Sequence, residues 1–246
     1  MCIRDRFSEG SSGTDRMLSA EWIEWLDRRD KARPFFGFLY YDAPVALDAP
    51  QDYPPVVSVP HDAPTQTRRR ARYLTAVHYV DSLVGTVLAD LERRKLADHT
   101  VVVVTSDHGM EFDENQLGFT GHGTAFSAYQ MRVPLVIRWP GRAPGRVERR
   151  TSHNDLAPTL LAGVFGCANP PSDYGSGHDL FAGPEWQWLV AAGYSIDFAV
   201  IEPDRVTVVW PFGYEVRDAD YRLIPRATLP RAELRAALQE MTRFYR

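Results

Sequence analysis

Apolar residues recur at helical spacing in two stretches of the first hundred residues. Leu18, Trp22 and Leu26 belong to the first pattern, which predicts a helix over about residues 17–30. The second pattern predicts a long helix over residues 65–96. Its apolar stripe comprises Tyr73, Val77, Val80, Val84, Val87 and Leu91.

Three further apolar runs have the length and the composition of strands. Phe35–Tyr41 predicts a buried strand, and Val101–Val104 is typical of a strand buried on both faces because all of its residues are β-branched. With the helix over residues 65–96 between them, these two strands predict a right-handed βαβ unit. Val133–Ile137 predicts another strand, which begins near Pro134.

The segments between these elements and after them differ in character. Asp42–Pro64 is rich in proline and predicts an irregular surface loop. Asp155 is expected to open a helix that contains Leu156, Leu160 and Val164, and Gly166 is expected to end it.

Beyond residue 186, short apolar runs are separated by turn-forming residues, a pattern that predicts an antiparallel sub-sheet. The expected strands are 188–192, 199–202, 205–210, 214–217 and 221–224. A closing helix is expected over Glu233–Tyr245. The predicted divisions are a disordered or non-native leader over 1–16, a partial α/β domain over 17–185 and a C-terminal subdomain over 186–246.

Composition excludes some classes of function. The 246 residues are 44% hydrophobic and 24% charged, as in ordinary globular proteins, and a net charge of −4 argues against a nucleic-acid partner. No apolar run approaches the roughly 18–20 residues that cross a bilayer. Cys2 and Cys167 are the only cysteines, too few for a disulfide framework or a zinc cluster.

Candidate chemistry begins where the four-valine strand ends. Asp107 and His108 follow it after Thr105 and Ser106, at the edge where open α/β sheets place their ligands. A carboxylate beside an imidazole is a ligand pair for a divalent metal, and Gly109 lets the chain turn away. The alternative is a polar turn that only caps the strand.

His122 lies between Gly121 and Gly123, so a metal ion or an anionic oxygen could approach it closely. The alternative is a surface loop histidine. Asp113 and Glu114 are expected to be solvated carboxylates, and the sequence leaves the role of Glu111 open.

The other polar residues are expected to be structural. His153 and Asp155 flank the start of a helix, where an acidic residue caps the backbone. His78 follows the stripe position Val77 and is expected to be packed, while His178 has no supporting context. No Gly-x-Ser-x-Gly elbow and no phosphate-binding loop is present, so no nucleophile can be assigned.

Several ordered segments carry a family resemblance. They resemble the sulfatase branch of the alkaline phosphatase superfamily, and Cys167–Phe181 points to the YejM/PbgA-like group of sulfatase-domain proteins of the bacterial envelope. The matching segments are RYLTAVHYVDSLVGTVLADLERRKLADHT, TVVVVTSDHG, GHGTAFSAYQMRVPLVIRWPG, TSHNDLAPTLL and CANPPSDYGSGHDLF.

The resemblance implies an α/β sandwich with a mixed central sheet and a small C-terminal antiparallel sheet plus helix, truncated at its N-terminus. It implies one divalent metal, Mg, Mn, Ca or Zn, held by Asp107 and His108. His122 matches a position that binds substrate, or a second metal, in related phosphoethanolamine transferases. The nucleophile, the other ligands and membrane-anchoring helices are expected upstream.

Two functions follow from this resemblance as expectations. The first is metal-dependent hydrolysis or transfer of a sulfate or phosphate ester, with this fragment inactive alone. The second is a non-catalytic domain that senses anionic lipid head groups in lipopolysaccharide homeostasis, at the periplasmic face of the bacterial inner membrane. The second is favoured by Val45, which stands where similar family members carry a histidine after a YYDAP-like segment.

Overall fold

The structure is a computed structural model that describes residues 10–194 and 196–245. Contacts between residues divide the chain into two compact units. Unit 1 comprises residues 1–106 and 134–142, and unit 2 comprises residues 107–133 and 143–246. The domain division at residue 186 stays a prediction.

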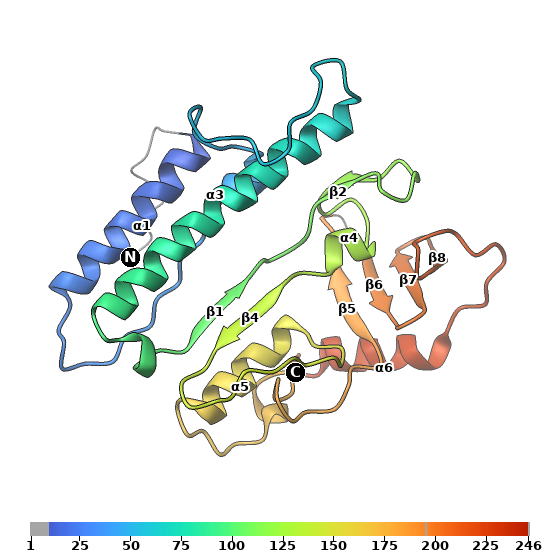
Figure 1. Cartoon of the computed structure of the whole chain (residues 1–246). Helices are drawn as coiled ribbons and strands as arrows, with labels where there is room; N and C mark the ends of the chain where they lie inside the picture. Colours follow the sequence, from blue (N-terminus) through green and yellow to red (C-terminus); the bar gives the residue numbers. More distant parts are fainter. Residues whose placement is uncertain (1–9, 195, 246) are drawn as a thin grey trace. The chain divides into compact units, whose positions relative to one another are not determined.

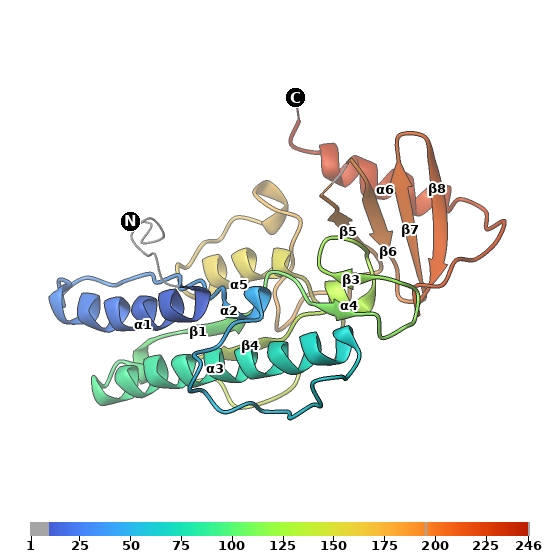
Figure 2. The same ribbon diagram turned by 90° about the horizontal axis from the view of Figure 1, so that it is seen from above.

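Two helices of unit 1 lie side by side, α1 (Ser11–Arg28) and α3 (Thr65–Arg93), as Figures 1 and 2 show. Leu26 of α1 and Leu91 of α3 belong to one buried apolar cluster, which Trp22 completes from its edge. Helix α1 begins earlier than the predicted residue 17 and inside the predicted leader. The rest of that leader, residues 1–9, lies outside the described residues.

A buried carboxylate joins α1 to the short helix α2 (Ala43–Ala46). The side chain of Asp15 is 1% exposed and accepts hydrogen bonds from the backbone N–H groups of Asp42 and Ala43. Burial raises the pKa of the Asp15 carboxyl above its usual value of 3.8, although these two hydrogen bonds lower it. Asp15 therefore anchors the start of the segment predicted as an irregular loop.

The buried face of α3 differs from the predicted stripe. Ala71, Thr75 and Tyr79 are buried, and the Tyr79 hydroxyl donates to the Ser12 carbonyl of α1 at 2.9 Å. Val77 of the predicted stripe is exposed. Thr75 Oγ1 accepts from the Val56 N–H of the preceding loop at 3.2 Å, so polar residues of α3 are buried against hydrogen-bond partners that apolar periodicity alone does not reveal.

The strands of unit 1 are β1 (Val102–Thr105) and β4 (Leu135–Arg138), which pair antiparallel with Val104 opposite Val136. The 3-10 helix η2 (Ala97–His99) leads into β1. Burial of β1 on both faces was predicted and is wrong, because Val136 on its only described neighbour is 63% exposed and Val104 is exposed as well.

The predicted strand over residues 35–41 is also wrong. All of these residues are described, they form no strand, and Phe36 and Phe38 are 77% and 78% exposed. The predicted βαβ unit is therefore not formed in the described chain. An apolar run specifies a strand only when a neighbouring strand supplies backbone partners, and no described segment pairs with this one.

Unit 2 contains a four-stranded antiparallel sheet in the order β5-β6-β7-β8, followed by the helix α6 (Figure 2). This confirms the predicted C-terminal antiparallel sheet with a closing helix. The elements of this part are β5 (Leu189–Ala192), β6 (Phe198–Ile201), β7 (Arg205–Trp210), β8 (Gly213–Asp218) and α6 (Arg231–Thr242).

The remaining elements of unit 2 precede this sheet. A hairpin that the sequence did not predict begins the unit, and the helix expected at Asp155 is present. They are β2 (Glu111–Phe112), β3 (Thr120–Gly121), α4 (Ala128–Met131), η3 (His153–Asp155), α5 (Leu156–Gly163) and η4 (Pro171–Asp173).

Tyr221 is buried in the core of unit 2. Its conformation explains why the strand predicted over 221–224 does not form. Its backbone has a φ of 66°, and its buried hydroxyl accepts from the Phe126 N–H at 3.0 Å. Only an isolated bridge joins Leu223 to Arg217. Tyr221 therefore points into the apolar cluster with Phe126 and Val208 instead of extending the sheet.

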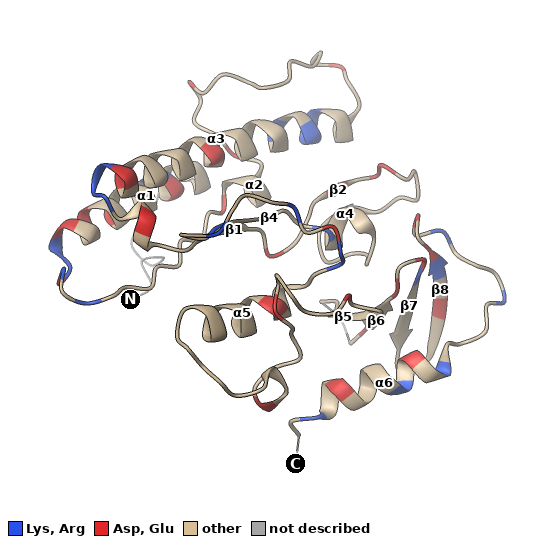
Figure 3. Cartoon of the chain, turned by 60° about the horizontal axis from the view of Figure 1, so that its bottom comes forward, with Lys and Arg blue, Asp and Glu red and all other residues tan. Residues whose placement is uncertain are grey.

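Helices α5 and α6 of unit 2 differ in their charged residues, as Figure 3 shows. Helix α6 carries both acidic and basic residues along its length, whereas α5 carries none between Leu156 and Gly163. Across the described residues, no helix is both long enough and apolar enough to span a bilayer.

Replacing Asp15 with alanine is expected to lower the free energy of unfolding by about 1–3 kcal/mol, because two buried N–H groups lose their acceptor. The folded chain binds the Asp15 proton more tightly than the unfolded chain does. The contribution of the carboxyl is therefore fully present below pH 3.8 and declines as the pH rises through the raised folded value.

Urea denaturation of the wild type and the Asp15→Ala variant should thus give a larger difference near pH 4 than near pH 7. The exposed Glu24, whose ion pair with Arg28 spans 3.8 Å, provides the control Glu24→Ala. Equal stability losses for the two variants would contradict the anchoring role of Asp15.

Candidate functional site

The turn after β1 carries the predicted metal ligands Asp107 and His108. The next residue, Gly109, donates its N–H to the Gln130 carbonyl at 2.8 Å. A Cβ at position 109 would lie 2.1 Å from the Tyr129 carbonyl oxygen, so only glycine fits this approach. Gly109 thus fixes the path of the chain directly beyond the two candidate ligands.

The structure brings the three predicted site residues together. The imidazole rings of His108 and His122 stack with centroids 4.2 Å apart and planes inclined by 10°. Asp107 Oδ2 lies 3.7 Å from His108 Nε2. A turn and the loop after β3 therefore form one cluster of a carboxylate and two imidazoles.

Hydrogen bonding fixes the tautomer of His108. Its Nδ1 lies 2.9 Å from the carbonyl oxygen of Gly109, and a carbonyl can only accept, so Nδ1 carries the proton. In the neutral ring the lone pair is then on Nε2, the nitrogen that faces Asp107. This is how metal-binding histidines are commonly oriented.

His122 is held from a different part of unit 2. The Tyr194 hydroxyl, in the turn between β5 and β6, lies 3.0 Å from His122 Nδ1. A Cβ at Gly123 would lie 2.1 Å from the Tyr194 ring, so this glycine makes room for the tyrosine. Burial lowers the pKa of His122, as does the neighbouring His108, while Asp107 opposes them.

A buried amide supports both histidines. Gln130 is 2% exposed, and its Oε1 accepts from the N–H groups of Thr124 and Ala125, just beyond His122. Its Nε2 donates to Glu111 Oε2 at 2.8 Å and to Thr124 Oγ1 at 2.9 Å. Because its carbonyl also holds Gly109, Gln130 links the two segments that carry the stacked rings.

The residues fit a divalent cation in their chemistry but not in their number. Two ligands of one ion with bonds of about 2.1 Å lie roughly 3–3.4 Å apart, close to the separation of Asp107 Oδ2 and His108 Nε2. Within the described chain, no group of three or more His, Cys, Asp or Glu side chains is arranged to hold an ion. Asp107 and His108 thus have the separation of two neighbouring ligands but do not form a closed site.

The acidic stretch of the hairpin has structural roles. Glu111 is buried, and its Oε2 accepts from Ser127 Oγ at 2.7 Å as well as from Gln130. The carboxylates of Asp113 and Glu114 accept from the backbone N–H groups of Gly118 and Phe112, both at 2.7 Å. These acids shape the hairpin that precedes His122.

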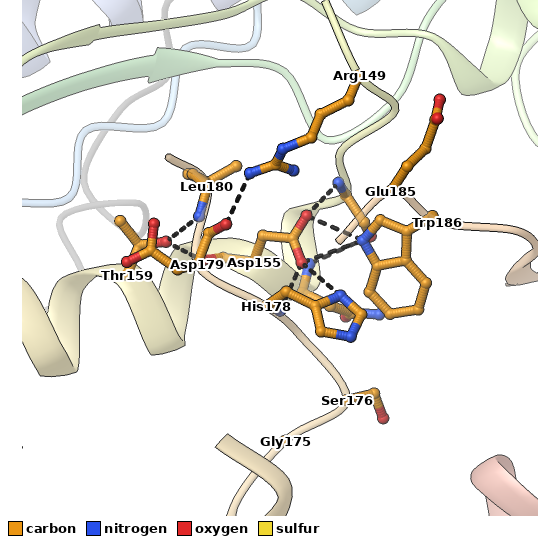
Figure 4. A network of polar contacts seen from close by, with 12 residues as sticks. Arg149, Asp155, Thr159, Gly175, Ser176, His178, Asp179, Leu180, Glu185 and Trp186 are labelled. Carbon is orange, nitrogen blue, oxygen red and sulfur yellow. Dashed lines mark hydrogen bonds and ion pairs between the residues drawn. The ribbon is translucent and has the colours of Figure 1, made fainter. Parts of the chain in front are cut away.

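A second polar cluster surrounds Asp155, as Figure 4 shows. The Asp155 carboxylate is fully buried and accepts from Trp186 Nε1 and from the N–H groups of Ser152 and His178. With the Ser152 side chain it completes a capping box, which agrees with the structural role expected of Asp155. The His178 ring lies against Trp186 with centroids 4.6 Å apart, a contact that the sequence did not indicate.

Two other predicted side chains lie elsewhere. His78 was expected to be packed and is instead exposed, with Nδ1 2.6 Å from the Tyr53 hydroxyl. Cys167 is a free thiol whose Sγ lies 3.8 Å from Asn169 Oδ1, and Cys2 lies outside the described residues.

Comparison with known proteins relates this chain to sulfatases and to similar membrane proteins. A family model described as Sulfatase matches residues 4–166. Inner membrane protein YejM of Salmonella typhimurium is 27% identical over 201 residues, covering 80% of this chain and 30% of YejM. N-acetylgalactosamine-6-sulfatase of Canis lupus familiaris is 35% identical over 174 residues, covering 67% of this chain and 31% of that protein.

A solved structure extends the similarity to the fold. The lipoteichoic acid synthase LtaP from Listeria monocytogenes superposes with a TM-score of 0.64 at 18% identity, covering 93% of this chain and 58% of LtaP. At this identity the similarity concerns the fold alone. It confirms the α/β fold expected from the sequence, and the chain spans less than a third of the two relatives above.

Replacing Gln130 with leucine tests its supporting role. The change would remove the acceptor of the Thr124 and Ala125 N–H groups and one of the two donors to Glu111 Oε2, and we expect a loss of at least about 3 kcal/mol in the free energy of unfolding. Urea denaturation measures this loss. Gln239→Leu, at an exposed position of α6, is the matched control. A loss of unfolding free energy below about 1 kcal/mol in Gln130→Leu would refute the supporting role of Gln130.

Proposed function

The chain belongs to the sulfatase family, and from this premise we propose that it contributes a metal-binding and anion-binding edge to a sulfatase-like hydrolase or transferase. The substrate would be a sulfate or phosphate ester. The single observation that carries the proposal is the clustering of the adjacent Asp107 and His108 with His122, which lies in a separate segment of the sequence.

Asp107 and His108 are proposed to hold one divalent cation, Mg, Mn, Ca or Zn. A bound cation would polarise the ester and stabilise negative charge that develops on its oxygens. The hydrogen bond from His108 Nδ1–H to the Gly109 carbonyl leaves the lone pair on Nε2, which faces Asp107 and could bind the cation. The remaining ligands would come from outside the described residues.

His122 is proposed to bind the anionic part of the substrate. It lies against His108, so a ligand on the ion and a ligand on His122 would be neighbours. The lowered pKa of His122 favours the neutral ring near neutral pH, in which one nitrogen donates and the other accepts. It would therefore orient the ester without adding a full charge.

The nucleophile is not assigned to any described residue. The Cys167 thiol lies 3.8 Å from Asn169 Oδ1, and an amide oxygen is not a base that could activate the thiol. Sulfate and phosphate esters share the tetrahedral anionic group that such a site would bind. N-acetylgalactosamine-6-sulfatase is a relative whose name identifies a sulfate ester.

A second candidate function is a non-catalytic domain that binds anionic lipid head groups in lipopolysaccharide homeostasis. It is supported by the similarity to inner membrane protein YejM, which extends over 80% of this chain. Val45, in α2, counts against the catalytic alternative, because a valine cannot donate a hydrogen bond where similar family members carry a histidine. This function would place the domain at the periplasmic face of the inner membrane.

The double variant Asp107→Ala with His108→Ala tests the metal role in the natural full-length protein. We expect it to abolish divalent-dependent turnover of aryl sulfate or aryl phosphate esters, with a loss of at least about 100-fold. In the 246-residue chain alone we expect weak Mn²⁺ binding and no turnover. Calorimetry should show that the double variant removes this weak binding.

The same dipeptide at Asp98 and His99 provides the matched control, Asp98→Ala with His99→Ala. It should leave turnover and Mn²⁺ binding unchanged. Turnover that survives loss of Asp107 and His108 would refute the metal role. Binding of lipopolysaccharide by the full-length protein without ester turnover would favour the second function.

A further inference from the structure

Tyr194 reaches the candidate site from the C-terminal sheet. It lies in the turn between β5 and β6, and its ring meets that of His122 edge-on, with centroids 5.9 Å apart and planes inclined by 66°. The hydroxyl lies 3.0 Å from His122 Nδ1. The residue is 77% exposed, so packing against a core does not account for its position.

The hydrogen bond leaves Nε2 as the only ring nitrogen of His122 that can meet a ligand. A phenol is a stronger donor than a neutral imidazole N–H, and imidazole nitrogen is a stronger acceptor than phenol oxygen. The favoured arrangement therefore has the Tyr194 O–H donating to Nδ1. The ring proton is then on Nε2, which makes Nε2 a donor and removes its lone pair.

We propose that Tyr194 is a positioning residue that presents His122 to the substrate as an Nε2–H hydrogen-bond donor for an anionic oxygen. The inference rests on the proposed function and deepens it. It assigns His122 to the sulfate or phosphate group and not to a second metal ion, because a metal would need the lone pair on Nε2. The two neighbouring histidines thus have opposite tautomers and opposite roles.

The opposite tautomers follow from the partners of the two rings. His108 donates from Nδ1 to the Gly109 carbonyl, which leaves an acceptor at Nε2 beside Asp107. His122 accepts at Nδ1 from Tyr194, which leaves a donor at Nε2. One ring is therefore suited to a cation and the other to an anion, although they stack 4.2 Å apart.

Nitrogen-15 NMR of the 246-residue chain at pH 8 reads the tautomer of His122 directly. The wild type should show His122 protonated at Nε2, and Tyr194→Phe should yield a mixture of the two tautomers. A wild-type His122 protonated at Nδ1 would overturn the proposal. So would a Tyr194→Phe spectrum that is identical to the wild type.

Titration with inorganic sulfate and inorganic phosphate tests the consequence for binding, followed at the Nε2–H of His122. Tyr194→Phe should weaken binding of these ions about 5- to 10-fold, the effect of one hydrogen bond. Equal affinities, or no response of wild-type His122 to either ion, would overturn the proposal. Tyr214→Phe is the control, because the hydroxyl of Tyr214 donates to Ala227 instead.

A pair of glycine variants displaces Tyr194 without removing its hydroxyl. Gly121 and Gly123 flank His122 and have positive φ values of 86° and 65°, so alanine strains the backbone at either position. Only at position 123 would the new Cβ meet the Tyr194 ring, since nothing lies within 4 Å of it at position 121. Gly123→Ala should change the tautomer and Gly121→Ala should not; equal spectra would overturn the role of Tyr194.

A parallel Mn²⁺ titration separates this inference from the proposed function. Tyr194→Phe should leave Mn²⁺ binding unchanged, whereas a loss as large as that of the Asp107 and His108 double variant would overturn the assignment of His122 to the anion. If the wild type binds no Mn²⁺ but shows the Nε2–H tautomer and its loss in Tyr194→Phe, the proposed metal role fails and the positioning role of Tyr194 stands.

Discussion

The candidate site depends on one buried amide. Gln130 uses both of its side-chain N–H groups, both acceptor positions of Oε1 and its backbone carbonyl within unit 2. A buried amide is tolerated only when its hydrogen bonds are satisfied, so the segments around Gln130 have little freedom to move apart. Gly109 and Thr124 are thereby fixed together, and the stacking of His108 on His122 follows from their place in the chain.

The residues that support the candidate site are buried, whereas Tyr194, which contacts His122, is mostly exposed. Behind it, Glu111 and Gln130 are almost fully buried and their polar atoms are paired within the fold. In front, Tyr194 is mostly exposed and contacts His122 through a single hydrogen bond and one ring edge. Buried supporting residues together with an exposed contact residue are expected where a binding group must be held in position but its ligand must still enter.

Local sequence pattern predicted the elements whose structure is set by local chemistry. The turn residues between the C-terminal strands predicted the antiparallel sheet, and a four-valine strand followed by Asp107 predicted the place of the candidate ligands. Residues 35–41 show the limit, because an apolar run specifies no pairing partner. Tyr194 shows another, since no local signal joins it to His122, a residue separated from it by 72 positions. No local signal marked Gln130 either, because its partners come from two other segments, around Gly109 and around Thr124.

The two proposed functions require different parts of the same cluster, which makes them compatible with one fold. Catalysis needs interactions that are stronger in the transition state than with the bound ester, which is the contribution of a metal and a nucleophile. Binding an anion needs only preorganised donors, and His122 is proposed to supply one without either of them. A sulfatase-family chain that lost its nucleophile would therefore retain an anion-binding edge.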